Sequence, residues 1–161
     1  MSGYRGAIRF FLIVGIVAAG LAACRLAPDY DDEIVQSLNA ATEDTSKFFA
    51  KVAGGTSPVD YKKREEIYTA LIGKYDALVI RLESRAYPKP TIPFVGRRVP
   101  VPEQAPSIAP VKKISESLGE MKKIDQASGL KRGDVAAFRL IFVIETRNAL
   151  TYENALKRDS Q

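Results

Sequence analysis

Four segments of the chain carry apolar residues at steps of three and four positions, the spacing that places side chains on one face of an α-helix. The expected helices cover residues 29–53, 57–86, 111–127 and 134–158. The first shows the pattern most clearly, with inward positions at Ile34, Val35, Leu38, Ala41, Thr45, Phe48, Phe49 and Val52. The pattern predicts an all-α protein.

Residues that start or stop helices stand at the edges of these segments. Two glycines at 54–55 are expected to end the first helix. Ser57 is the expected N-cap of the second helix, with Pro58 at its first position. The sequence Ser-Gly-Leu at 128–130 predicts a Schellman ending for the third helix, and Asp134 is the predicted cap of the fourth.

A proline-rich segment, residues 88–110, separates the second and third helices. It holds seven of the nine prolines, a density that excludes a helix. In a polyproline conformation its 23 residues would reach about 70 Å, whereas the second helix spans about 43 Å. The sequence therefore leaves the direction of the third helix open. It predicts two helical hairpins joined by a long crossover, in a four-helix bundle-like domain covering residues 24–161.

Three further expectations concern packing inside the bundle. The centre of the fourth helix, residues 140–144, is apolar on all sides, which is typical of a buried strand or of the central helix of a bundle. Helical spacing on both sides favours the helix. Glu145 and Arg147 follow this run and are expected to form a buried ion pair. Gly73, within the second helix, is expected to mark a close helix contact.

Composition removes many kinds of chemistry. The chain has no His and one Cys, which excludes imidazole-dependent triads and metal sites, internal disulfides and cysteine-rich zinc sites. No phosphate-binding glycine loop, nucleophile elbow or calcium loop is present. The carboxylates that a glycosidase would need are Glu65, Glu66, Glu116, Glu120 and Glu145, which fall mostly on polar helix faces among lysines. We therefore predict no enzyme activity, no metal and no cofactor.

Three tyrosines, Tyr61, Tyr68 and Tyr75, recur every seven residues in the second helix. Their aromatic faces could form a platform for a flat ligand. Heptad spacing is more typical of a core seam, and the sequence favours that interpretation.

The N-terminus carries the most specific signal. Residues 1–28 contain no acid, and Arg5 and Arg9 come before an apolar run of 14 residues. A membrane-spanning helix needs roughly 20 apolar residues, so the shorter run fits the hydrophobic region of a secretory signal peptide. The run closes with Leu-Ala-Ala-Cys at 21–24. This motif resembles the lipobox of bacterial lipoproteins. The resemblance implies that residues 1–23 are removed as a signal peptide and that Cys24 is acylated.

The resemblance also implies where the protein resides: on a bacterial membrane, facing the periplasm and held by acyl chains on Cys24. Arg25, in place of an aspartate after that cysteine, favours the outer over the inner membrane. Loss of the leader reduces the 24 basic residues to 22 against 19 acidic ones, a near balance that does not indicate a nucleic-acid partner. Residues 25–28 form a short tether. Acids at the start of the first helix should oppose its lying flat, so the bundle should stand close above the membrane.

The proline-rich segment offers one candidate contact. Arg97 and Arg98 form a basic doublet beside Phe94, a combination that suits a protein partner or anionic headgroups. Together these features predict a lipid-anchored helical interaction or accessory protein of the cell envelope with a membrane-proximal partner. The alternatives are a small-ligand bundle that uses the tyrosines and the space between the second and fourth helices, and an envelope enzyme.

Overall fold

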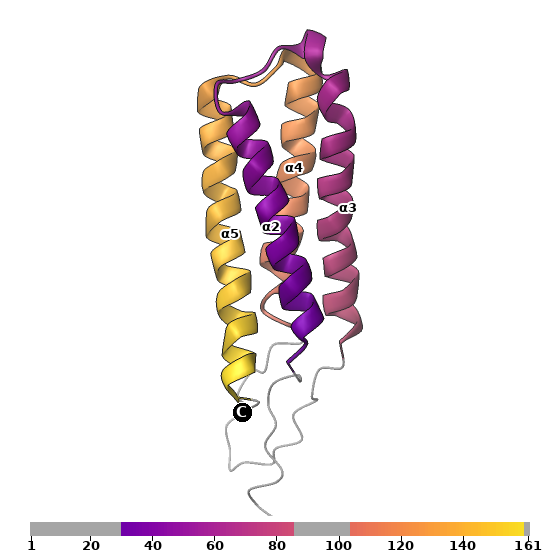
Figure 1. Ribbon diagram of the computed structural model, residues 1–161, viewed down its shortest axis with the longest axis vertical. Coiled ribbons are helices and arrows are strands. Elements are labelled where there is room, and N and C mark those ends of the chain that lie inside the picture. Colours follow the sequence, from indigo (N-terminus) through magenta and orange to yellow (C-terminus); the bar gives the residue numbers. More distant parts are fainter. Residues whose placement is uncertain (1–29, 86–103, 160–161) are drawn as a thin grey trace, which may run out of the picture.

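The structure, a computed structural model, describes residues 30–85 and 104–159. They form α2 (Asp32–Val52), the short 3-10 helix η1 (Pro58–Asp60), α3 (Lys62–Ser84), α4 (Ile108–Ser128) and α5 (Arg132–Asp159), with no strand in these ranges. The four long helices run up, down, up and down in one bundle (Figure 1). The predicted all-α, bundle-like fold is confirmed.

Each helix packs against two neighbours, in the cyclic order α2, α3, α4, α5. Contacts between α3 and α4 pair early residues of one with late residues of the other: Lys122 Nζ donates to Thr69 Oγ1 at 3.0 Å, and Ser115 Oγ donates to Asp76. These helices are therefore antiparallel, which settles the direction that the sequence left open. The end of α3 and the start of α4 lie at the same end of the bundle as the start of α2 (Figure 1).

Helix boundaries differ from the predicted ones by a few residues. α4 begins at Ile108, three residues earlier than expected, and includes Pro110 in its first turn. A proline is tolerated there because the first N–H groups of a helix have no intrahelical acceptor. Ser57 caps the second segment through its side chain, which accepts from the Val59 N–H. The turn that follows is the 3-10 helix η1, so α3 itself begins only at Lys62.

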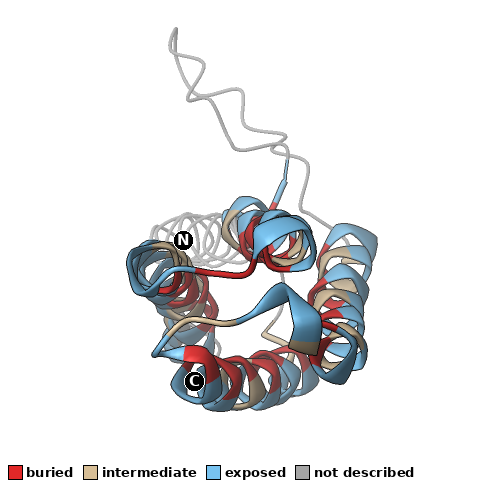
Figure 2. Ribbon diagram, turned by 90° about the horizontal axis from the view of Figure 1, so that it is seen from above, coloured by how far each residue is buried: buried red, intermediate tan, exposed pale blue. Residues whose placement is uncertain are grey.

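Buried side chains fill the space between the helices. Figure 2 shows the buried residues on the inner sides of the bundle and the exposed residues on the outside. Tyr68 and Tyr75 are fully buried and Tyr61 nearly so. Tyr68 meets Phe48 edge-on, with ring centroids 4.7 Å apart, and the Tyr75 hydroxyl lies 3.2 Å from Thr45 Oγ1. The tyrosine stripe is therefore a core seam.

The fourth long helix is not the central one, contrary to expectation. Phe142 of α5 is buried and its ring lies 5.4 Å from that of Phe49, centroid to centroid. Leu140, Val143 and Ile144, however, are 60%, 39% and 46% exposed. In a ring of four helices every helix has an outward face, so a helical segment that is apolar on all sides must expose some of its apolar side chains to solvent.

Two packing expectations are also wrong. Arg147 is exposed and Glu145 is half-buried, accepting a hydrogen bond from Asn148 at 3.4 Å instead of forming a buried ion pair. Gly73 is exposed, and a Cβ added there would meet no atom within 4 Å, so it marks no close helix contact.

The turn between α4 and α5 also differs in detail. Gly129 has a φ of 74° and ends α4, but the Leu130 N–H donates to Thr56 Oγ1 at 2.8 Å and not back into α4 as in a Schellman motif. Asp134 lies inside α5 and reaches back to accept from the Lys131 N–H at 2.8 Å. Asp134 therefore lies in the first turn of α5 and not at the N-cap position that the sequence predicted.

Candidate functional site

The sequence-predicted site residues fall into two groups. Cys24, Phe94, Arg97 and Arg98 lie outside the described residues. Tyr61, Tyr68 and Tyr75 lie in the core, where a ligand cannot stack on their faces. The polar chemistry of the described chain is found elsewhere: in two buried carboxylates and along one surface groove.

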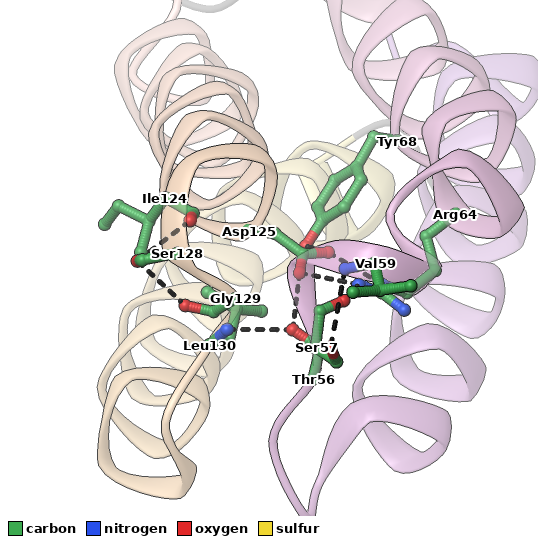
Figure 3. A network of polar contacts seen from close by, with 10 residues as sticks. All are labelled: Thr56, Ser57, Val59, Arg64, Tyr68, Ile124, Asp125, Ser128, Gly129 and Leu130. Carbon is green, nitrogen blue, oxygen red and sulfur yellow. Dashed lines mark hydrogen bonds and ion pairs between the residues drawn. The ribbon is translucent and has the colours of Figure 1, made fainter.

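The first buried carboxylate is Asp125 of α4, at the end of the bundle that carries the turns 53–61 and 129–131 (Figure 3). Arg64 of α3 donates to both of its oxygens, from Nε at 2.7 Å and from Nη2 at 2.8 Å. Tyr68 donates its hydroxyl to Asp125 Oδ2 at 3.2 Å, and Thr56 donates to Oδ1. Arg64 Nη2 also donates to the Ser57 carbonyl at 2.8 Å. The network therefore joins α3, α4 and the turn after α2.

Electrostatics keep this pair ionised. Burial alone would raise the pKa of Asp125, but hydrogen bonds from Arg64 and Thr56 and the charge of Arg64 together lower it. The hydrogen bond to Asp125 raises the pKa of Arg64, and burial followed by the charge of Asp125 raises the pKa of Tyr68. Since the carboxylate is fully buried and its bonding partners are all within the protein, we assign it a structural role.

The second buried carboxylate is Glu153 of α5, at the opposite end. It accepts from Arg85 Nη2 at 3.0 Å and from Ser107 Oγ at 2.6 Å. It thereby ties α5 to the end of α3 and the start of α4. Sequence reasoning missed both carboxylates. The available signal was spacing: Asp125 follows Met121 by four residues and Leu118 by seven, which places it on the buried stripe of its helix.

A groove runs along the surface between α2 and α3. It consists of two adjoining hollows of about 410 and 310 Å³ that share Lys74, and we call it the α2–α3 groove. Its apolar floor includes Phe48, Ile67 and Leu71. Its charged lining residues are Lys47, Lys51, Lys63, Lys74, Arg81, Asp44 and Glu66. Five cations and two anions line it, and three of the cations also pair with acids just outside the lining: Lys47 with Glu43, Lys63 with Asp60 and Arg81 with Glu33.

One of the two acids of the groove, Asp44, is unsuited to act as the general acid of a glycosidase. Lys74 donates to Asp44, and this hydrogen bond, with the charge of Lys74, lowers the pKa of Asp44. A general acid needs a raised pKa. Of the glutamates considered from the sequence, Glu65 pairs with Lys62 at 2.8 Å, Glu66 lines the groove, and Glu116 and Glu120 are exposed on α4.

Within residues 30–85 and 104–159, no group of three or more His, Cys, Asp or Glu residues could hold a metal ion. No helix in these ranges is long and apolar enough to cross a membrane. The fold and site define an antiparallel four-helix bundle with buried ion pairs and an open groove that has an apolar floor and charged edges. Comparison with known proteins found no matching family model, no similar curated protein and no similar solved structure.

Proposed function

We propose that this chain is a lipid-anchored interaction protein of the bacterial envelope, facing the periplasm, whose partner binds in the α2–α3 groove. Two features support the proposal: the lipobox-like sequence ending at Cys24, and an open groove on a bundle with a filled core. The groove carries the functional part of the argument because it combines an apolar floor with a cationic lining.

The shape and charge of the groove favour one kind of occupant. Along α2 it extends from Ser37 to Lys51, and along α3 from Lys63 to Arg81. At 1.5 Å per helical residue these spans are about 21 and 27 Å, the length of roughly four to five helical turns. An amphipathic helix of a partner, with acidic residues beside its apolar face, matches both the floor and the charge.

A small-ligand function has less support. Its expected site used the tyrosine stripe and the space between the second and fourth helices. Tyr68 and Tyr75 are 0% exposed, and the two hollows of the α2–α3 groove lie at the surface of α2 and α3. An open groove of this kind suits a helix better than a small molecule, which is usually enclosed over most of its surface.

The anchor is tested by Cys24→Ser. The substitution removes the only thiol of the chain, so metabolic labelling with palmitate should disappear and the protein should keep its precursor size. Persistent palmitate labelling of the variant would contradict the lipoprotein assignment.

The groove is tested by photo-crosslinking. A photo-reactive amino acid at position 70, which is exposed in the groove, should crosslink the full-length chain to one defined partner in membranes. Reversing two exposed lysines, Lys51→Glu with Lys63→Glu, should reduce this product at least fivefold. The matched control, Lys112→Glu with Lys113→Glu, reverses two exposed lysines on α4 and should leave it unchanged. Equal loss in both double variants, or no loss in either, would contradict binding in the groove.

A further inference from the structure

The outward face of α5 differs in charge from the other helices. Among α5 residues whose burial is described, every exposed ionisable side chain is basic: Arg132, Arg139, Arg147, Lys157 and Arg158. Its acids point elsewhere: Asp134 and Glu145 are half-buried, and Glu153 is fully buried. In contrast, α2, α3 and α4 each expose side chains of both signs.

The same face carries the exposed apolar residues noted above. Val143 and Ile144 come three and four residues after Leu140, so the three side chains form one stripe along the helix. The exposed alanines at 136–137 extend the stripe toward the start of α5. Arg139 lies beside the stripe and Arg147 at its end. We call this surface the α5 face.

We propose that the α5 face lies on the membrane surface and binds anionic phospholipid. An apolar stripe flanked by Lys and Arg is the pattern of helices that lie in the interface of a bilayer, with the apolar side chains among the upper parts of the acyl chains. Near an anionic surface each Lys or Arg contributes roughly a fivefold gain in binding. A face that carries cations and, among residues 132–158, no exposed acid fits negatively charged headgroups.

The position of the tether supports lipid as the occupant, and this step rests on the proposed anchor. Lys157 Nζ, near the end of α5, lies 5.6 Å from the centroid of the Tyr30 ring, so the first described residue lies beside the end of α5. The six residue-to-residue steps from Cys24 to Tyr30 reach at most about 22 Å. An anchored bundle therefore holds the C-terminal end of α5 close to the headgroups, where even weak attraction suffices to bring the rest of the α5 face onto them.

This orientation also accounts for the groove. Because α5 packs against α2 and α4, α3 lies diagonally across the bundle from it (Figure 2). When the α5 face rests on lipid, the α2–α3 groove is turned away from the bilayer and open to a partner. The sequence favoured an upright bundle because a short tether is followed by acids at the start of the first helix. Because of the exposed apolar stripe, we instead expect the bundle to lie with α5 against the membrane surface.

The test uses the full-length chain in bacterial membranes with photo-reactive benzoylphenylalanine at position 144. The matched control carries it at position 80, where Ile80 of α3 is 68% exposed on the far side of the bundle. After irradiation, mass spectrometry should find phospholipid adducts at position 144 at least fivefold above those at position 80. Reversing Arg139→Glu with Arg147→Glu should lower the adduct at 144 at least fivefold, whereas Lys112→Glu with Lys113→Glu should not.

Other results would overturn the proposal. Adducts to a protein at position 144 would show that a partner covers the α5 face, and equal lipid adducts at 144 and 80 would show an unoriented bundle. Absence of lipid adducts at 144 would also contradict it. Palmitate labelling of Cys24 in the same membranes separates the two proposals: a labelled chain without lipid adducts at 144 defeats the α5 inference alone, and an unlabelled chain defeats the anchor.

Discussion

The buried pair of Arg64 and Asp125 should be the most sensitive polar contact in the bundle. Asp125→Ala leaves the Arg64 guanidinium, which is 7% exposed, without its partner and removes the acceptor of the Tyr68 hydroxyl. Removing one member of a buried ion pair costs about 3–5 kcal/mol. Since whole domains are stable by roughly 5–15 kcal/mol, the variant should lose a large share of its free energy of unfolding.

Urea denaturation of the purified chain in mild detergent, followed by circular dichroism, measures this loss. Asp60→Ala is the matched control, because it removes an exposed carboxylate that pairs with Lys63 at 2.7 Å, and it should cost less than about 1 kcal/mol. A double-mutant cycle of Asp125→Ala and Arg64→Ala should give a coupling energy of about 2 kcal/mol or more. If Asp125→Ala cost no more than the control, the reasoning about this network would be refuted.

Three further predictions follow from the same contacts. The folded state lowers the pKa of Asp125, so the charged carboxylate stabilises the protein fully above the ordinary pKa of an aspartate and less as the pH falls below it. The difference in free energy of unfolding between wild type and Asp125→Asn, measured by urea titration, should therefore shrink below about pH 4. Gly129 has a positive φ, and a Cβ added there would clash with the Thr56 carbonyl, so Gly129→Ala should lower the free energy of unfolding by at least about 2 kcal/mol. Gly73→Ala, in an open part of a helix, should raise it by up to about 1 kcal/mol. Equal effects of the two substitutions would contradict the turn geometry. Tyr75→Ala should lower the free energy of unfolding by about 3 kcal/mol or more, because the ring is fully buried. Tyr75→Phe should lower it by about 1 kcal/mol, because the hydroxyl is hydrogen-bonded to Thr45. An unchanged melting temperature of the alanine variant would argue against a core role.

The helices themselves could be predicted because amphipathic periodicity is a local property of the sequence. α2 was expected at 29–53 and occupies Asp32–Val52, and the two glycines after it end the helix as expected. The inward set of α2 was also predicted in full, including Thr45. Such a set follows from spacing alone, whichever helices the face packs against.

The arrangement of those helices depends on contacts between distant residues. Arg64 and Asp125 are separated by 61 positions, and nothing in the local pattern of either helix identifies the other as its partner. Their burial could have been suspected from spacing, because each lies on the apolar stripe of its helix. The pairing, and with it the antiparallel direction of α4, required the fold.

The α5 face shows where periodicity gave a wrong answer. Residues 140–144 are apolar on all sides, and the sequence suggested a central helix because such runs are usually buried. In a ring of four helices no helix is central, so each has one side that its neighbours do not cover. An apolar side chain on that side needs some other cover or remains in water. The failed prediction of burial is thus the observation that points to a binding surface.

The tether and the α5 face should act together, and a spacer separates their contributions. Inserting about 20 Gly and Ser residues after Pro28 adds a chain with an end-to-end distance of roughly 25 Å, which lowers the effective concentration of the α5 face at the membrane. If the face binds lipid, the spacer alone should reduce lipid adducts at position 144 less than twofold. Without a binding face, the longer tether should release the bundle and the adducts should fall severalfold.

Combining the spacer with the charge reversal on α5 tests whether the tether and the α5 face compensate for each other. In the chain with the spacer, Arg139→Glu with Arg147→Glu should nearly abolish the adducts at position 144, because neither the short tether nor the cations then hold the face down. The combined loss should exceed the product of the two separate losses, since each device partly compensates for the absence of the other. If the combined loss of adducts equalled the product of the two separate losses, the tether and the α5 face would act independently. A bundle that both devices hold to the same surface should not behave in that way.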